Sequence, residues 1–165
     1  MRVEVKILDP RLPGWGFPHW GSPLAAGLDL HACLDEPLTI GPGHAPVLIS
    51  CGAAFRMEAG WCGMVAPRSG LGHRGLVLGN TVGIIDADYE GPCLLSAWNR
   101  NPPGTREVLT IEPGDRIAQM LFVPVARPAM AVVLDFASAS VRGEGGFGST
   151  GLSGAAVSPP GAASS

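Results

Sequence analysis

The sequence has few charged residues and no excess of positive charge. Only 15% of its 165 residues are charged, and the formal net charge is −3. A protein that binds a nucleic-acid polymer needs a basic surface to neutralise the phosphates, so this composition argues against that class of partner. A small anion held by a few local donors is still compatible with it.

Long apolar runs and paired cysteines are also missing. No stretch of 18 apolar residues is present, which argues against a membrane-spanning helix and a membrane partner. Residues 1–8 alternate charged and apolar side chains and lack the apolar run of a secretory signal. The four cysteines contain no CxxC pair, so zinc-binding and thioredoxin-like spacings are absent. We therefore expect reduced thiols and a cytoplasmic location.

Glycine and proline, in contrast, are abundant. The 165 residues include 24 glycines and 16 prolines, which both oppose helix interiors, so long helices and coiled coils are excluded. The hydrophobic fraction of 46% is nevertheless enough to form a core. The composition predicts a single domain built from short strands and turns.

Short runs with strand character recur about every ten residues. In residues 27–33, Leu28 and Leu30 are expected on the core face, and Asp29 and His31 on the opposite face. Many short strands joined by turns favour an all-β antiparallel sandwich or barrel. The predicted strands cover residues 2–8, 27–33, 46–50, 62–66, 75–78, 82–85, 93–98, 107–111, 116–123 and 130–135.

Two features mark the ends of elements. Residues 112–115 read Glu-Pro-Gly-Asp, which predicts a type II turn because its third residue needs a positive φ. Residues 152–165 are small residues and prolines without charge, which is typical of a disordered tail. We therefore expect one domain over residues 1–151, followed by the tail 152–165.

The glycine-rich segment 142–151 has the strongest chemical signal. Its backbone N–H groups, the hydroxyls of Ser149 and Thr150, and the guanidinium of Arg142 could together hold a triphosphate. The alternative is a flexible linker, but Phe147 favours a lid that stacks on a base. Residues 143–148 also match GxGxxG, yet no strand and helix surround them, which excludes a dinucleotide-binding fold.

Three other stretches are more ambiguous when taken alone. Arg68 and Ser69 lie beside glycines and could bind phosphate, or form an ordinary surface turn. Asp86 ends a predicted strand and could act as a general base, or belong to a solvated hairpin tip. Gln119 lies among aliphatic residues and needs a partner, either a ligand or a neighbouring strand. Asp29 poses a similar choice, because it could have such a partner or be a solvated surface carboxylate.

Taken in order, five strings resemble the motifs of the trimeric dUTPase family. They are AGLDLHA, PRSGLG, GNTVGIIDADYEG, GDRIAQMLF and RGEGGFGSTG, and they cover roughly residues 26–151. The resemblance implies a distorted jelly-roll (β-clip-like) antiparallel sandwich that assembles as a homotrimer. It also implies hydrolysis of dUTP to dUMP and pyrophosphate with Mg²⁺.

The resemblance further implies a role for each motif residue. Asp86 would activate the water that attacks the α-phosphorus, and Asp29 would order the site and the water shell of Mg²⁺. The metal would be held mainly by substrate phosphates and water, as Mg²⁺ prefers. The phosphates would be bound by Arg68, Ser69 and Gly70, with Gln119 nearby.

The remaining motif residues would recognise the nucleoside and close the site. Asn80, Ile84 and Ile85 would bind uracil, and Tyr89 would pack under the deoxyribose. The C-terminal arm would be shared between subunits: its γ-phosphate ligands would be Arg142, Ser149 and Thr150, and Phe147 would cover the uracil.

The chain departs from the family pattern at two places. Glu90 stands where the third motif often has arginine, and residues 23–26 lack the usual serine before AGLDL.

Two alternative functions also stay open: a dCTP deaminase of the same fold, and a non-catalytic nucleotide-binding β-trimer. The DADYEG string and Phe147 favour the dUTPase.

Overall fold

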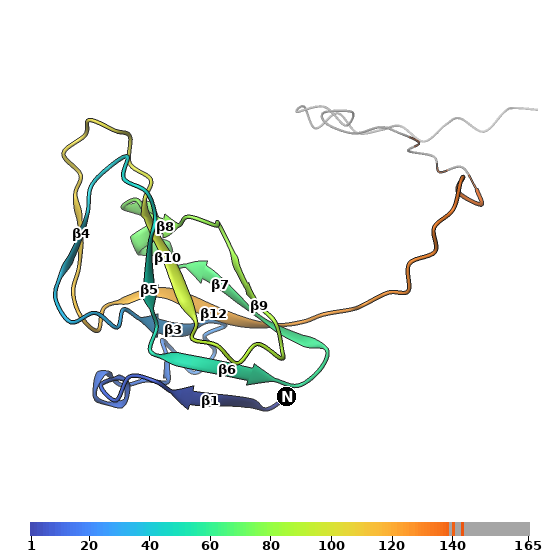
Figure 1. Cartoon of the computed structure of the whole chain (residues 1–165), viewed down its shortest axis with the longest axis horizontal. Helices are drawn as coiled ribbons and strands as arrows, with labels where there is room; N and C mark the ends of the chain where they lie inside the picture. The colour runs from blue at the N-terminus through green and yellow to red at the C-terminus, as the bar shows by residue number, and fades with distance from the viewer. Residues whose placement is uncertain (139, 141–142, 144–165) are drawn as a thin grey trace, which may run out of the picture. The chain divides into compact units, whose positions relative to one another are not determined.

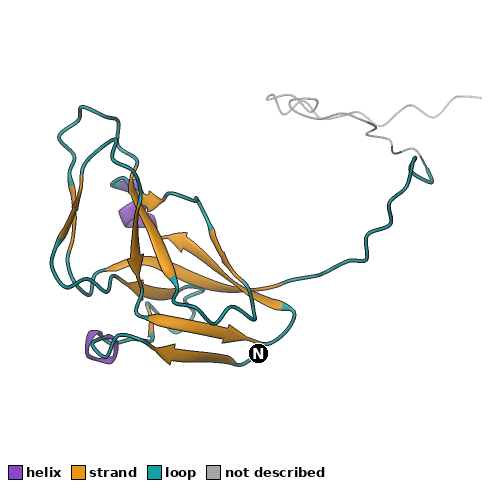
Figure 2. Ribbon diagram, in the orientation of Figure 1, coloured by secondary structure: helices purple, strands orange, loops and turns teal. Residues whose placement is uncertain are grey.

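A computed structural model describes residues 1–138, 140 and 143 of the chain. Its elements are nearly all strands, joined by loops and two very short helices (Figure 2). In chain order they are β1 (Val3–Ile7), η1 (Leu12–Trp15), β2 (His19–Trp20), β3 (Leu28–His31), β4 (Leu38–Ile40), β5 (Val47–Ser50), β6 (Ala53–Met57), β7 (Trp61–Pro67), α1 (Ser69–His73), β8 (Leu76–Leu78), β9 (Gly83–Ile85), β10 (Leu94–Asn99), β11 (Leu109–Ile111) and β12 (Arg116–Pro124).

The strands form four antiparallel sheets. The largest has the order β2-β3-β12-β7-β9, and the others are β5-β10-β8, β11-β4 and β1-β6. Strands β1 and β6 lie side by side in Figure 1 and pair Ile7 with Ala53, although 46 positions separate these two residues. The predicted all-β, antiparallel fold class is confirmed.

The five-stranded sheet positions most of the candidate site residues. Its central strand β12 pairs with β3 on one side and β7 on the other, so that Gln119 lies opposite both Asp29 and Ala66. Alternate residues such as Leu30 and Met120 are fully buried in the core. Burial of these side chains fixes the register, because a slip of one residue would turn them towards solvent.

The predicted turn at residues 112–115 is present and leads directly into β12. Gly114 has φ of 86°, and the Asp115 N–H donates to the Glu112 carbonyl over 3.0 Å. The Asp115 carboxylate also accepts the Glu112 N–H over 2.9 Å. This turn therefore fixes the start of β12 at Arg116.

Residues Met1–Arg127 form one compact unit, and Pro128–Ser165 form a second. The strand predicted at residues 130–135 is wrong, because these residues have no regular secondary structure. Several of their apolar side chains are almost fully exposed: Met130 (86%), Val132 (101%) and Leu134 (105%). A strand needs a partner for its backbone groups, and this described segment has none.

Several sequence expectations fall outside the residues that the structure describes. They are the tail 152–165, the domain end near Gly151 and the glycine-rich segment 142–151, of which only Gly143 is described. Among the described residues, no helix is long and apolar enough to cross a membrane.

All four cysteines are free thiols that form no disulfide, as expected.

Candidate active site

A buried aspartate lies at the centre of a charged cluster on the five-stranded sheet. Asp29 of β3 is only 6% exposed, and its carboxylate contacts two guanidinium groups. Oδ1 lies 3.0 Å from Arg68 Nε, and Oδ2 lies 3.0 Å from Arg116 Nη1. His19 Nε2 also lies near this carboxylate, 3.8 Å from Oδ2. A buried carboxylate needs such partners, because an unpaired charge inside a protein is strongly destabilising.

The expectation that Asp29 and His31 lie on a polar face opposite the core is wrong, and so is the alternative that Asp29 is a solvated surface carboxylate. All four residues of β3 are buried, since β2 covers one edge and the η1 region packs over His31. The His31 ring is 1% exposed and lies 6.3 Å from the rings of both Trp15 and Phe17. Burial, reinforced by the charge of Arg116, lowers the pKa of His31, so the neutral imidazole is favoured.

Arg68 is held at two positions of its guanidinium group. Besides its contact with Asp29, its Nη1 donates to the Arg116 carbonyl over 2.9 Å. The side chain is 34% exposed, so one edge still faces solvent. The next residues, Ser69 and Gly70, begin helix α1 and are exposed. Arg68, Ser69 and Gly70 thus present a cation, a hydroxyl and backbone N–H groups together, as a phosphate ligand requires.

Gln119 joins the same cluster through a neighbouring strand. Its Nε2 donates to the Pro67 carbonyl over 3.0 Å, which is the more common of the two outcomes expected for a half-buried amide. Its side chain also lies directly against Gly27, where a Cβ atom would clash with it. Gly27 therefore leaves the space that Gln119 occupies beside Asp29.

A second group of candidate residues lies around the end of β9. Ile84, Ile85, Asp86 and Tyr89 line a hollow of about 210 Å³, together with Pro92 and Leu94. The Tyr89 hydroxyl donates to the Pro92 carbonyl over 3.2 Å, and its ring lies against Gly91. This hollow combines apolar walls with one carboxylate, a setting suited to a nucleoside.

Asp86 and Asp88 do not lie in one extended strand. The Tyr89 N–H donates to the Asp86 carbonyl over 3.2 Å, so residues 86–89 form a turn. Asn80 lies in the connection before β9, where the next residue, Thr81, has φ of 62°. This positive φ is strained for a β-branched residue, and such strain is commonly found at binding sites.

The two groups are far apart within one chain. Asp29 is level with Ala66 across β12, and the β7–β9 register places Asp86 level with Cys62, four residues further along. At about 3.3 Å per residue and 4.8 Å per strand, Asp86 lies roughly 20 Å from Asp29. One copy of the chain therefore does not bring Asp86 to Arg68 and Gln119.

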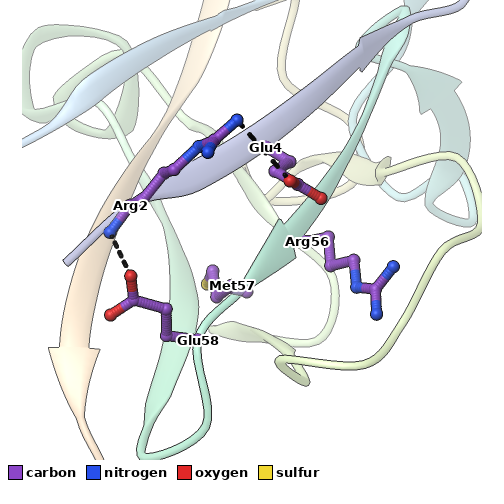
Figure 3. A pocket seen from close by; sticks show the side chains of 5 residues that line it. All are labelled: Arg2, Glu4, Arg56, Met57 and Glu58. Carbon is purple, nitrogen blue, oxygen red and sulfur yellow. Dashed lines mark hydrogen bonds and ion pairs between the residues drawn. The ribbon is translucent and has the colours of Figure 1, made fainter.

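The structure also contains surface hollows that hold none of the expected site residues. One of about 370 Å³ is lined by Arg2, Glu4, Arg56, Met57 and Glu58, and Figure 3 shows that charged groups surround it. The Arg2 N–H donates to Glu58 over 3.0 Å, and its guanidinium pairs with Glu4 at 3.7 Å. The other arginine, Arg56, pairs with Glu90 at 3.4 Å, so each cation of this hollow already has a carboxylate partner.

Arg116 and His19 are site residues that the sequence reasoning missed. Arg116 stands inside the GDRIAQMLF string, but only pairing with β3 reveals that it lies beside Asp29. His19 belongs to a two-residue strand, which is too short for a periodicity signal. The lid residues Arg142, Phe147, Ser149 and Thr150 lie outside the described part of the chain.

The fold is that of the jelly-roll nucleotide enzymes, and comparisons with known proteins identify the family. The family model described as dUTPase matches residues 14–151. A deoxyuridine 5'-triphosphate nucleotidohydrolase of Xylella fastidiosa (strain M23) is 51% identical over 152 residues, covering 91% of this chain and 95% of that protein. The chain therefore belongs to the dUTPase family and is an enzyme of the nucleotidohydrolase class.

Solved structures agree with this assignment. A dUTPase of Staphylococcus bacteriophage 80alpha with dUPNHPP has a TM-score of 0.80 and 27% identity, covering 92% of this chain and 99% of that chain. A mutant dUTPase of phage phi11 of S. aureus, described with a structural Mg(II) ion, has a TM-score of 0.71. It is 22% identical, covers 84% of this chain and 100% of its own, and supports the fold alone.

Proposed function

We propose that this enzyme hydrolyses dUTP to dUMP and pyrophosphate, with Asp86 as the general base. The reaction lowers dUTP and supplies dUMP for thymidylate synthesis. The observation that carries this proposal is the placement of two groups of candidate residues at different positions on the five-stranded sheet. The end of β7 presents Arg68, Ser69 and Gly70 to an anion, and the opposite end of the neighbouring strand β9 presents an apolar hollow beside Asp86.

The proposed reaction is an attack of water on the α-phosphorus. Asp86 is exposed at the end of β9, where it can accept the proton of a water that its carboxylate orients. The new P–O bond forms as the bond to the bridging oxygen breaks, and pyrophosphate leaves. Arg68 and Ser69 bind the phosphates and stabilise the charge on the leaving group, while Gln119 helps to position them.

Nucleoside selection is proposed to occur at the hollow around β9. Asn80, Ile84 and Ile85 bind uracil largely through backbone groups, and Tyr89 packs under the deoxyribose, where a 2'-hydroxyl would clash. A buried polar group left unpaired by the wrong base costs about 1–3 kcal/mol. That penalty is sufficient to discriminate against cytosine.

The donor set fits Mg²⁺ only as a metal held through phosphate and water. No group of three His, Cys, Asp or Glu among the described residues could hold a metal ion. Both Asp29 oxygens contact arginine, so Asp29 is proposed to order the water shell. Bound Mg²⁺ would neutralise triphosphate charge and favour in-line attack.

We propose a homotrimer whose sites combine residues of different copies. The separation of roughly 20 Å between Asp86 and Asp29 supports this, because a general base must lie within hydrogen-bond reach of its water. The exposed apolar residues of segment 130–136 also favour a partner copy. Arg142, Ser149 and Thr150 are proposed to bind the γ-phosphate from such a shared arm, with Phe147 over the uracil.

A cytoplasmic location is part of the proposal. The four free cysteines support it, because thiols stay reduced in that compartment.

A nucleotide panel tests the proposed function. With Mg²⁺, pyrophosphate release should be far faster from dUTP than from dTTP, dCTP or UTP. Equal turnover of all four nucleotides would contradict the recognition argument. Ammonia release from dCTP would instead indicate a deaminase, and tight binding without turnover would indicate a nucleotide-binding protein.

The role of Asp86 is tested by Asp86→Asn. This variant should bind dUpNHpp about as well as the wild type but lose at least about 100-fold in kcat, the scale of a general base. Asp88→Asn, which changes an exposed carboxylate two residues away, is the matched control and should keep its activity. Full activity of Asp86→Asn would remove the assigned base.

A further inference from the structure

We infer that Arg116 is a positioning residue that keeps Arg68 available for the phosphates. This inference rests on the proposed function, in which Arg68 binds the substrate. Arg116 is the first residue of β12 and was given no role by the sequence motifs. Two contacts of Arg116, one from its side chain and one from its backbone, carry the inference.

The first contact concerns charge. An arginine paired one-to-one with a buried carboxylate has its charge largely neutralised and attracts a phosphate only weakly. Here Asp29 is shared: one oxygen contacts Arg68 and the other contacts Arg116, each at 3.0 Å. Two guanidinium groups against one carboxylate leave a net positive charge on the cluster. Without Arg116, Asp29 would neutralise Arg68.

The second contact concerns geometry. The Arg116 carbonyl accepts Nη1 of Arg68 over 2.9 Å, so the same residue fixes the guanidinium plane of Arg68. Nε of Arg68 lies against Asp29 and Nη1 donates to this carbonyl, while the side chain is 34% exposed, so part of the guanidinium group still faces solvent. A guanidinium group that is held rigidly and remains partly open is well suited to bind phosphate oxygens.

The two arginines should therefore tolerate lysine differently. Arg116 uses a single nitrogen, Nη1, towards Asp29, and a lysine ammonium can supply both that donor and the charge. Arg68 uses two nitrogens towards two different acceptors, which one ammonium cannot reproduce. Arg116→Lys should be mild, whereas Arg68→Lys should be severe.

The experiment measures binding of dUpNHpp and dUMP, together with kcat and KM for dUTP. Arg116→Gln removes the charge at similar size and should weaken dUpNHpp binding and raise KM by about 10- to 100-fold, as expected for a lost charge-assisted interaction. Binding of dUMP, which lacks the β- and γ-phosphates, should change by less than about threefold. Arg116→Lys should restore most of the lost affinity. Arg106→Gln, which removes one exposed arginine elsewhere, should change none of these values.

The outcomes separate the two proposals. Arg116→Gln binding dUpNHpp as well as the wild type, or losing dUMP affinity equally, would overturn the inference, and so would Arg116→Lys behaving like Arg116→Gln. Arg116→Met, a second uncharged variant, replaces Arg116→Gln if the latter does not fold. A wild type that releases no pyrophosphate would refute the proposed function, while the binding comparison would still decide the role of Arg116.

Discussion

Gly91 matters at the scale of a single residue because it leaves space for the ring of Tyr89. A Cβ atom at position 91 would lie 2.9 Å from Cε2 of Tyr89 and closer still to Cζ. The ring would have to move, and the hydrogen bond from its hydroxyl to the Pro92 carbonyl would be lost. The position of Tyr89 under the proposed sugar thus depends on the absence of a neighbouring side chain.

We expect Gly91→Ala to lower the preference for dUTP over UTP. The ratio of their kcat/KM values should fall about tenfold, which corresponds to ~1.4 kcal/mol of discrimination. Gly14→Ala is the matched control, since a Cβ atom there meets no neighbour within 4 Å. Tyr89→Phe keeps the ring and removes only the hydroxyl, so it should lower the ratio less. An unchanged ratio in Gly91→Ala would contradict the proposed role of Tyr89.

His31 predicts a pH dependence of stability. Its pKa is lowered in the folded state, chiefly by burial, so the unfolded chain binds the proton more readily. Stability should be complete above about pH 6.5, the ordinary pKa of histidine, and decline as the pH falls below it. This one group contributes a slope of at most about 1.4 kcal/mol per pH unit.

Urea unfolding of the wild type and His31→Phe between pH 5 and 7.5, at one protein concentration, tests this expectation. The phenyl ring can pack between Trp15 and Phe17 and does not titrate, so the variant should have a flatter profile. The exposed His73→Gln should follow the wild type. Parallel profiles for the wild type and His31→Phe would show that His31 is not the responsive group.

At the scale of elements, the sequence located several strands as short apolar runs between turns. Alternation in residues 2–8 located β1, although four of its five side chains are exposed. The runs 62–66 and 116–123 located β7 and β12 to within about two residues, because these strands bury several apolar side chains in the core. Strand β6 was missed, although three of its first residues are apolar and buried, because a continuous run has no alternation. Strand β2 has two residues and depends entirely on β3.

The candidate site could be predicted only in part, because burial and cross-strand register depend on residues that are distant in the sequence. Motif strings identify which residues carry chemistry, and Gln119 indeed lies beside Asp29 across β3 and β12. Sequence spacing could not show that Asp29 is buried, because β2 and the η1 region cover it from distant positions. The role of Arg116 likewise depends on cross-strand register, which a single sequence does not specify.

At the scale of the whole molecule, the proposed enzyme needs more than one copy of the chain. Asp86 and Arg68 lie at opposite ends of the neighbouring antiparallel strands β9 and β7, so a complete site would take Asp86 from one copy and Arg68 from another. Two inactive variants with different defects should then complement each other. This behaviour would not arise if each chain built its own site.

We expect a mixture of Asp86→Asn and Arg68→Gln to regain activity after the subunits exchange. With equal amounts and random assembly, about a quarter of the sites would receive an intact Asp86 from one copy and an intact Arg68 from another. Pyrophosphate release from dUTP should therefore rise from near zero to roughly a quarter of the wild-type rate once the mixed chains have been unfolded and refolded together. The double variant refolded with wild type is the control for exchange itself. If chains exchange in this control but the mixture of the two single variants stays inactive, both residues act within one copy. That outcome would contradict the shared site.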